Sequence, residues 1–564
     1  MSKRHVFLQI TLRHLMTLLA LIGGGLFVMG RVSWAESPQA SGFGRLGVPR
    51  GSETELSIAG KVGTLPATVW CSDPAVAVAL NEKGDKLVIS PAEATRPGRC
   101  WIRIANAEGA TSLLPLMIGV LPEVMEVEPN NNLAKSQELT ERGIVVNGSL
   151  HQGGEVDMYH MHLSAGETLV ASVDAHRAFD SPIDTVLQIV SPQGRVLMQN
   201  DDHHGNDPQL AYTAAASGTV YVRIFGFPSA PNSTIAFAGS ATSRYRLTVT
   251  TGPFVSHVIP ADATSPDFDA AFDHPNGNWI ATGENLSGVG RAVKEGSQDR
   301  LMTTAELRDV PGLHAMQFGD VASSEGSPRL NVWGALSTRE EVMAVHTFPA
   351  KKGESLKVSV EAQRFGSQLD PVVRILGADG AVLKEADDVS RDNFDADFVW
   401  KAQADGDYEL EVSDRFRHTG SRYFYRADVR IETPQVTATV GTDQFVLTTD
   451  KELKIPVTLT RIAGHVAPVT VELVGAPEGV TVTSAVTEKK KEVASIVTLE
   501  LKTNGDVRFS GPVEIRVAET VRAESAGGDN SGPLPSVKAT ALLPIGGGRT
   551  PTIWLTVQAK DKAP

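Results

Sequence analysis

The chain has few of the residues and motifs on which catalysis and covalent cross-linking depend. Only two cysteines occur among 564 residues, and aromatic residues make up 6% of the chain. It contains no Gly-x-Ser-x-Gly elbow, His-Glu-x-x-His pair, glycine-rich phosphate loop or subtilase-like Gly-Thr-Ser segment. These absences exclude the enzyme classes that such motifs mark and favour a protein that is not an enzyme. An unrecognised hydrolase stays an alternative, because a catalytic triad is defined by geometry and not by sequence order.

The two cysteines are Cys71 and Cys100. Two cysteines are too few for a metal centre, and neither has a histidine beside it that would indicate a reactive thiol. In an exported chain, two cysteines that flank a short domain usually pair. The sequence therefore predicts a Cys71–Cys100 disulfide.

Long apolar runs are also absent, with one exception at residues 15–30. Basic residues precede that run, and Ser33-Trp34-Ala35 then places small residues at the two positions that a signal peptidase reads. The pattern predicts a signal peptide over residues 1–35, cleaved after Ala35, and hence a secreted, periplasmic or envelope-associated protein. The run is short for a membrane span, although an uncleaved N-terminal anchor is the alternative. No later segment has the length and apolarity of a span, so we expect no integral membrane segment after cleavage.

The net charge is negative and becomes more so after cleavage. The formal net charge is −14, and removing residues 1–35 takes away four cations and no acid, which leaves about −18. Nucleic acid is therefore not an expected partner. The length predicts about three to five domains. The oligomeric state cannot be read from the sequence.

Short segments that alternate apolar and polar residues, with Gly, Asn and Asp between them, continue to the C-terminus. Residues 169–173 and 220–224 are examples, and helical periodicity is nearly absent after residue 35. Strands at this spacing are typical of β-sandwiches. We predict an all-β chain of tandem β-sandwiches.

An internal repeat is visible when the chain is aligned with itself. Residues 169–177 match residues 356–364, and the closing Ser-Gly-Thr-Val-Tyr-Val-Arg at 217–223 matches Asp-Gly-Asp-Tyr-Glu-Leu-Glu at 405–411. The offset between the copies is 186 to 188 residues. We call residues 122–252 the first module and residues 328–432 the second module, and we expect them to share one sandwich fold.

The first module carries a series of motifs in a fixed order. They are Glu-Pro-Asn-Asn, a Gly-Ser-Leu strand, Glu-Val-Asp-Met-Tyr, Ala-Gly-Glu, Ser-Pro-Ile-Asp, a Pro-Gln-Gly turn, Asn-Asp-Asp and a closing Gly-Thr-Val-Tyr-Val-Arg. This series resembles the bacterial pre-peptidase C-terminal domain, and the second module resembles a degenerate copy. The resemblance implies jelly-roll sandwiches. The whole chain looks like the multi-domain exported proteins of planctomycete-like bacteria that carry such modules without a protease.

Oxygen-bearing side chains crowd the start of the first module, and in calcium-binding relatives the matching positions supply the ligands of the ion. Calcium takes six to eight oxygens from carboxylates and amides with loose geometry. The alternative is that residues 126–131 shape a turn and the carboxylates face water. At an offset of 186 residues, residues 126–131 correspond to residues 312–317 and Asp157 corresponds to Met343, so the second module should lack the site. The ligand set that the resemblance implies is Glu126, Glu128, Asn130, Asn131, Glu155 and Asp157.

Another acidic set recurs in both modules and is expected to cap turns through carboxylate to N–H hydrogen bonds. His203 and His204 have no counterparts in the second module and are interpreted as loop histidines. His160 and His346 align at the 186-residue offset, which favours packing over chemistry. The recurring acids are Asp184, Asp201, Asp202 and Asp207 in the first module and Asp370, Asp387, Asp388 and Asp395 in the second.

The flanking segments read as immunoglobulin-like sandwiches, and residues 253–327 as a linker or a degenerate β domain. The sequence thus predicts an immunoglobulin-like domain at 42–121, jelly-roll modules at 122–252 and 328–432, and a C-terminal immunoglobulin-like domain at 435–560. The predicted function is non-catalytic binding or adhesion, with extracellular protein, polysaccharide or the cell envelope as partner. A peptidase-associated accessory protein and a structural envelope spacer are the alternatives. Most aromatic residues fall at core positions, so no exposed aromatic platform for carbohydrate is expected.

Overall fold

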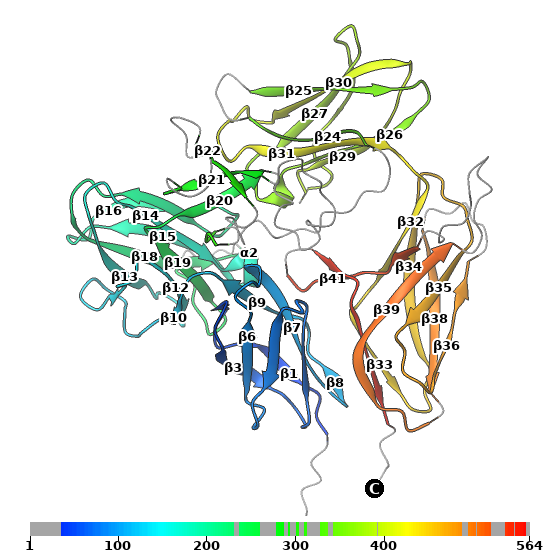
Figure 1. Cartoon of the computed structure of the whole chain (residues 1–564), viewed down its shortest axis with the longest axis horizontal. Coiled ribbons are helices and arrows are strands. Elements are labelled where there is room, and N and C mark those ends of the chain that lie inside the picture. Colours follow the sequence, from blue (N-terminus) through cyan, green and yellow to red (C-terminus); the bar gives the residue numbers. More distant parts are fainter. Residues whose placement is uncertain are drawn as a thin grey trace, which may run out of the picture. The chain divides into compact units, whose positions relative to one another are not determined.

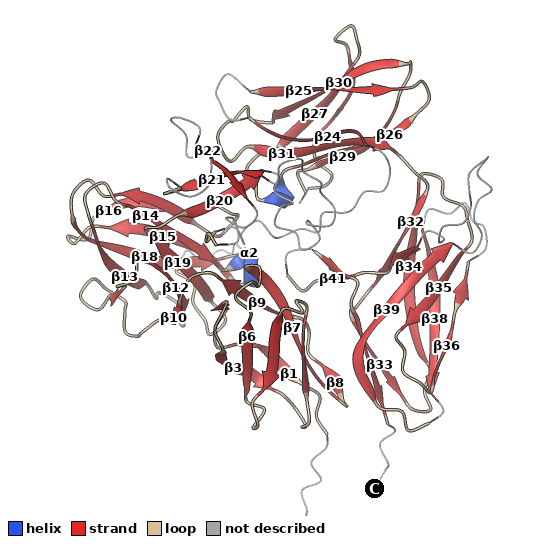
Figure 2. Ribbon diagram, in the orientation of Figure 1, coloured by secondary structure: helices blue, strands red, loops and turns tan. Residues whose placement is uncertain are grey.

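A computed structural model shows a chain built almost entirely of β-strands (Figures 1 and 2). The all-β class predicted from the sequence is confirmed. The signal peptide prediction lies outside the described residues, apart from Ala35. No helix within the described part of the chain is both long and apolar enough to cross a membrane. The structure describes residues 35–230, 236–259, 278–286, 292–293, 300–303, 309–312, 328–336, 342–391, 393–487, 494–503, 505–519, 536–545 and 548–559.

The N-terminal sandwich consists of two sheets with strand orders β1-β3-β6-β5 and β2-β9-β7-β4, and β8 pairs with β7. Phe43, Leu56, Ile102 and Leu116 belong to the single apolar core between them. The strands are β1 (Gln39–Phe43), β2 (Gly47–Pro49), β3 (Thr54–Lys61), β4 (Thr68–Cys71), β5 (Val76–Leu80), β6 (Lys86–Pro91), β7 (Gly98–Asn106), β8 (Gly109–Ala110) and β9 (Leu114–Gly119).

The first module is a sandwich of two five-stranded sheets, with strand orders β10-β12-β19-β14-β17 and β11-β13-β18-β15-β16. β10 and β11 run parallel to their neighbours at the sheet edges, and every other pairing is antiparallel. Its elements are β10 (Glu123–Met125), β11 (Gln137–Glu138), β12 (Gly143–Ser149), β13 (Asp157–Leu163), β14 (Thr168–Asp174), α2 (His176–Phe179), β15 (Ile183–Val190), β16 (Val196–Asn200), β17 (Gln209–Thr213), β18 (Gly218–Pro228) and β19 (Arg244–Thr250).

The described residues of the second module repeat eight strands of this sandwich and include no counterpart of the two parallel edge strands. Its sheet orders are β24-β31-β26-β29 and β25-β30-β27-β28, which match β12-β19-β14-β17 and β13-β18-β15-β16 strand for strand. In β26, Leu356, Val358 and Val360 are buried and alternate with half-buried residues, as the sequence pattern predicts. The elements are β24 (Pro328–Ala335), β25 (Met343–Ala350), β26 (Ser355–Glu361), η3 (Gln363–Phe365), β27 (Pro371–Leu376), β28 (Val382–Ala386), β29 (Ala396–Lys401), β30 (Gly406–Asp414) and β31 (Phe424–Ile431).

A small sheet lies between the two modules in the sequence. A four-stranded sheet of order β20-β21-β23-β22 falls within the segment predicted as a linker or degenerate domain. It comprises β20 (Phe254–Ile259), β21 (Asn278–Glu284), β22 (Ala292–Val293) and β23 (Arg300–Thr303).

The C-terminal sandwich has sheets of order β32-β34-β38-β36 and β33-β43-β39-β35-β37, and β40 pairs with β39. Its strands are β32 (Gln435–Val440), β33 (Gln444–Thr448), β34 (Leu453–Ile462), β35 (Val469–Val474), β36 (Val480–Thr483), β37 (Ala485–Val486), β38 (Ala494–Thr503), β39 (Phe509–Glu519), β40 (Ser536–Lys538), β41 (Ala541–Leu542), β42 (Arg549–Thr550) and β43 (Ile553–Gln558).

Candidate cation site

The acidic segment of the first module connects β10 to β11 and crosses the start of β13. The Glu126 N–H donates to the Asn147 carbonyl of β12 (3.0 Å), and the Met158 N–H of β13 donates to the Asn130 carbonyl (3.1 Å). The peptide bond between Glu128 and Pro129 is cis. These backbone contacts hold the Glu-Pro-Asn-Asn segment against the two strands, so its side chains meet those at the start of β13.

Two overlapping groups of potential ligands result. One oxygen each of Glu128, Glu155 and Asp157 lie within 4.8 Å of one another, and Glu126, Glu128 and His151 form a second group of the same size. Asp157 is fully buried and Glu155 nearly so. Glu128 is shared by both groups. The described residues around it therefore bring four carboxylates and one imidazole together in a single cluster.

Several buried polar atoms in this cluster have no hydrogen-bond partner within the described structure. They are both side-chain atoms of Asn130, which is fully buried, and Oδ1 of Asp157. A buried amide or carboxylate oxygen without a partner is energetically unfavourable. The one ion pair described in the cluster is the 3.9 Å contact between His151 Nδ1 and Glu126 Oε1. A cation would satisfy these oxygens and the excess negative charge.

Two tyrosine hydroxyls form a hydrogen-bonded chain that ends on the buried carboxylate of Asp157. The Tyr245 hydroxyl of β19 donates to Asp157 Oδ2 (2.7 Å), so the Tyr159 hydroxyl, 2.5 Å away, is the donor to Tyr245. Tyr245 reaches this position over Gly148, where an added Cβ would lie 2.3 Å from the ring. The glycine of the Gly-Ser-Leu motif is thus required by close packing, and the relay of hydroxyls orients Asp157.

The electrostatics of the cluster favour protonation when no cation is present. Burial, and then the charges of Glu126, Glu128 and Glu155, raise the pKa of Asp157 to about 8 despite the Tyr245 hydrogen bond. Burial is also the main cause that raises the pKa of Glu126 to about 7. Calcium and other hard divalent cations take carboxylate and amide oxygens of this kind. The oxygens present fit such an ion, which would be held by Glu128, Glu155 and Asp157 with Asn130 and Glu126 beside them.

Five of the six residues implied by the family resemblance therefore lie together. The sixth, Asn131, is exposed, and none of the hydrogen bonds described for the cluster involves its side chain. The sequence analysis did not find His151, Tyr159 or Tyr245. A signal for Tyr245 was available, because Tyr425 occupies the same strand position in the second module and also packs over a glycine, Gly334.

Among its described residues the second module shows no counterpart of the cluster, and its register corrects two expectations. Leu163 pairs with Gly218, and Ala350 pairs with Gly406, which are equivalent glycines of the repeat. The offset in this strand is therefore 187 residues, so Asp157 corresponds to Ala344 and not to Met343. His346 then corresponds to Tyr159 and not to His160. His346 Nε2 lies 2.7 Å from the Tyr425 hydroxyl, which repeats the Tyr159–Tyr245 contact without any carboxylate.

The capping role predicted for the recurrent acids is fulfilled by Asp207 and Asp395. The Asp207 carboxylate accepts hydrogen bonds from the N–H groups of Ala175, His176 and Arg177 (2.8–3.1 Å). Asp395 accepts from the N–H groups of residues 362 and 363 (2.7 and 2.8 Å). Both fix the turn that follows equivalent strands, β14 in the first module and β26 in the second.

The other recurrent acids do not show this role in the described hydrogen bonds. Asp387 instead pairs with Arg415 (2.9 Å), which also lies 3.8 Å from Asp388. In the first module, burial and the charges of Asp202 and Asp201 raise the pKa of Asp184. Burial lowers the pKa of the neighbouring His203 to about 3, so this loop histidine is neutral at physiological pH.

Cys71 and Cys100 are free thiols in the structure. They lie on neighbouring strands of one sheet, because Cys71 of β4 pairs with Ile102 of β7, two residues from Cys100. A hydrogen bond from Cys100 lowers the pKa of the Cys71 thiol, whereas the same contact and burial raise that of Cys100. The two side chains are thus neighbours, and the disulfide between them stays a prediction.

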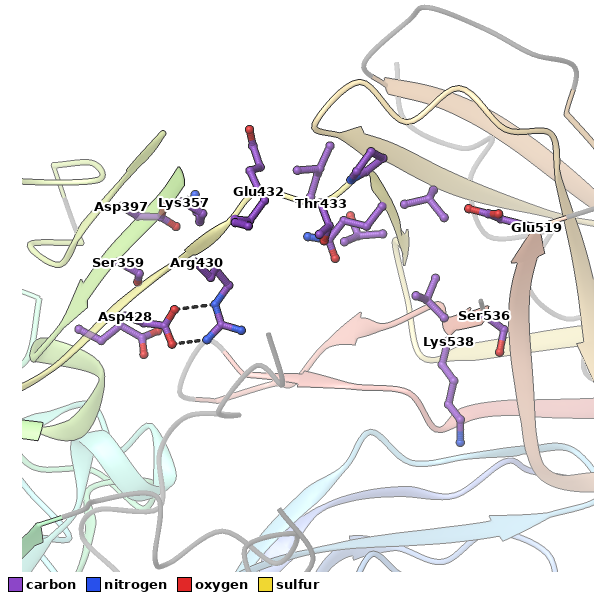
Figure 3. A pocket seen from close by; sticks show the side chains of 18 of the residues that line it. Lys357, Ser359, Asp397, Asp428, Arg430, Glu432, Thr433, Glu519, Ser536 and Lys538 are labelled. Atoms are coloured by element: carbon purple, nitrogen blue, oxygen red, sulfur yellow. Dashed lines mark hydrogen bonds and ion pairs between the residues drawn. The ribbon is translucent and has the colours of Figure 1, made fainter. Parts of the chain in front are cut away.

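A pocket of about 830 Å³, with both charged and apolar side chains in its lining, lies where β31 continues through residues 432–434 into β32 (Figure 3). Its lining includes Lys357, Asp397, Asp428 and Arg430, and these form the ion pairs Lys357–Asp397 and Arg430–Asp428. Paired charges of this kind supply neither a nucleophile nor an open ligand set. The acidic cluster of the first module is therefore the stronger candidate site.

Comparison with known proteins adds little to these observations. No family model matches the chain, and no curated protein matches it. Among solved structures, immunoglobulin domains 1–4 of Sidekick-1 share 9% sequence identity with a TM-score of 0.22, covering 93% of this chain and 97% of that one. A DUF4785 family protein from Legionella pneumophila shares 9% identity with a TM-score of 0.10, covering 70% and 92%. At these scores the likenesses carry no argument about function.

Proposed function

We propose that the protein is an exported, non-catalytic binding protein made of tandem β-sandwiches, and that its first module is a calcium-stabilised module of the pre-peptidase C-terminal type. The observation that carries this proposal is the cluster of the exposed Glu128 with the buried Glu155 and Asp157, together with the buried, unpartnered side-chain atoms of Asp157 and the neighbouring Asn130. Four carboxylates at the edge of a sandwich core would repel one another without a cation. Extracellular calcium concentrations suit a site of this kind, whose affinity is tuned by ligand charge and rigidity.

The proposal is tested by calorimetric titration of calcium into the chain that begins at Glu36, together with its melting temperature with calcium and with a chelator. We expect saturable binding and a raised melting temperature, because a ligand that binds only the folded state stabilises it. Magnesium should bind more weakly, since it requires near-ideal octahedral geometry.

The variant Asp157→Asn separates a cation site from an ordinary acidic cluster. At about pH 9, above the Asp157 pKa of about 8, it removes a buried charge that is repelled by Glu126 and Glu128, so the chelated variant should melt above the chelated wild type at that pH. Calcium should no longer raise its melting temperature. The matched control is Asp201→Asn, which changes an exposed aspartate of the same module and should leave the calcium response intact. If calcium produces no heat of binding and does not change the melting temperature of the wild type, residues 126–131 form a turn and not a cation site.

The two alternative functions predict different behaviour. An accessory protein of a secreted peptidase should co-purify with that peptidase from culture supernatant, and a structural spacer should show no saturable ligand. The fold of tandem sandwiches is compatible with each, since such sandwiches support many binding roles.

A further inference from the structure

β18, the central strand of its sheet in the first module, presents a row of large side chains outward. It pairs with β13 on one side and β15 on the other. Val220, Val222 and Ile224 point into the core and are buried. The alternate residues are Tyr221, Arg223, Phe225 and Phe227, all half-buried, and they occupy the opposite face.

A third phenylalanine joins this row from the segment after β18. Phe237 is 37% exposed, and its ring centroid lies 4.6 Å from that of Phe225 and 5.5 Å from that of Phe227. The three phenyl rings have no polar group of their own and lie on the outer face of a sheet. The sequence analysis expected no exposed aromatic platform, and this cluster corrects that expectation.

Polar side chains are fixed next to the rings. The Arg223 Nε–H donates to Gln188 Oε1 (2.7 Å), and the Gln188 amide donates to Gln199 Oε1 (2.5 Å). On the other side of Arg223, the His160 ring contacts Tyr221 at 5.5 Å between centroids. The face therefore combines flat apolar surfaces with hydrogen-bonding groups that are held in place by one another.

The second module shows that the sandwich does not require this face. With Gly218 equivalent to Gly406, the positions of Tyr221, Phe225 and Phe227 are occupied by Glu409, Ser413 and Arg415. The neighbouring Arg374 forms ion pairs with Glu385 (2.6 Å) and Glu411 (3.1 Å). The same face of the same fold is thus charged in one copy and aromatic in the other.

The surroundings restrict the kind of ligand. The backbone of β18 is paired on both sides, so a peptide cannot bind here by adding a strand, and a ligand must contact side chains. A sugar ring offers an apolar C–H face that packs on aromatic rings and hydroxyl groups that bond to amide and guanidinium groups. The mature chain is strongly acidic, which disfavours anionic polymers.

We propose that the outward row of β18, with Phe237, is a binding platform for a neutral polysaccharide. The inference rests on the proposed extracellular binding function and assigns its contact surface and ligand class. Phe225, Phe227 and Phe237 pack against the sugar rings, and Arg223, positioned by the buried Gln188, bonds to hydroxyl groups.

The test is native affinity electrophoresis of the chain that begins at Glu36 in gels containing xylan, galactomannan or hydroxyethylcellulose, with polygalacturonate as the anionic comparison. At least one neutral polymer should retard the wild type. Phe237→Ala and Phe227→Arg, the latter placing the second module's residue in the first, should each weaken the apparent affinity roughly tenfold. Phe237→Trp should retain binding. Phe416→Ala is the matched control, because it removes a phenylalanine of the second module that is 66% exposed.

No retardation of the wild type by any neutral polymer would overturn the proposal, as would retardation by polygalacturonate alone. Equal retardation of the wild type and of folded Phe237→Ala and Phe227→Arg would do the same. The calcium-dependent melting shift is recorded on the same samples. Loss of that shift with retained retardation would overturn the cation site only, and the reverse result would overturn the platform only.

Discussion

The two repeated modules share a strand order and differ in what is built on it. Both have a buried tyrosine that packs over a glycine, Tyr245 over Gly148 and Tyr425 over Gly334. The strands β10 and β11 of the first module have no counterpart among the described residues of the second, and Glu126 and Glu128 of the acidic cluster lie on the segment that joins them. The eight strands described in both modules form the shared sandwich. The cluster is an addition to the fold, and its unfavourable electrostatics are better explained by a ligand than by folding.

The largest difference in stability is expected at an arginine that the modules share. Arg246 is buried and bonds to Glu123 through Nε and Nη2 (3.1 and 2.6 Å) and to Asp174 through Nη1 (3.2 Å). Among the described residues, its counterpart Arg426 has one long ion-pair contact, 3.9 Å to Asp428. Arg246→Ala removes the cation that the buried carboxylates of Glu123 and Asp174 share and should reduce the free energy of unfolding by about 3–5 kcal/mol.

Chemical denaturation of both alanine variants tests this difference. Arg426→Ala should reduce the stability of its module by clearly less than Arg246→Ala does. Equal losses would mean that the two arginines have the same role and that the first module is not distinguished by its buried ion pairs.

The pH dependence of the chelated protein should come from the first module. Because the pKa values of Asp157 and Glu126 in the folded state are about 8 and about 7, both above the ordinary carboxyl range, their protonation stabilises the fold at low pH. This stabilisation is fully present below the ordinary carboxyl pKa of about 4, is lost as pH rises from there to the folded-state values, and should amount to a few kcal/mol. The melting temperature with a chelator should therefore fall between about pH 4 and pH 8 and level off at higher pH.

Calcium should remove this fall, because it binds the ionised carboxylates and releases protons. Asp157→Asn should also flatten the profile of the chelated protein, whereas Asp201→Asn should not. A profile that is flat in the wild type would show that the cluster is hydrated and not buried.

The turn aspartates should differ less between the modules. Asp207 accepts three backbone hydrogen bonds of 2.8–3.1 Å, whereas Asp395 accepts two of 2.7 and 2.8 Å and has only a weaker third interaction with the N–H of Arg364. Hydrogen bonds to a charged group contribute about 1.5–3 kcal/mol each, and their loss at one side chain is not additive. Denaturation curves should show that Asp207→Ala destabilises its module by about 1 kcal/mol more than Asp395→Ala does. The opposite order would indicate that the number of accepted bonds does not determine the role of these residues.

The sequence predicted the features that depend on local pattern and missed those that depend on register. Alternation identified the strands, and the order of motifs collected five of the six cluster residues. The sequence pattern could not predict the contact between Tyr245 and Asp157. These residues are 88 positions apart in the chain and meet only when β19 has joined its sheet. A one-residue difference in offset likewise moved His346 from the position of His160 to that of Tyr159. Such contacts depend on pairing between strands that are far apart in the chain, and this pairing cannot be predicted from a single sequence.

The smallest difference concerns Arg415, which neutralises an acidic group of the second module. It pairs with Asp387 (2.9 Å) at the surface, and the first module has Phe227 at the equivalent position beside Asp184. Exposed ion pairs contribute about 0–1 kcal/mol and are screened by salt. Arg415→Ala should therefore lower the melting temperature slightly at low ionic strength and not at all in about 1 M salt, where the Debye length is about 3 Å. A loss that persists in high salt would instead show that the packing of the Arg415 side chain, and not its charge, stabilises this turn.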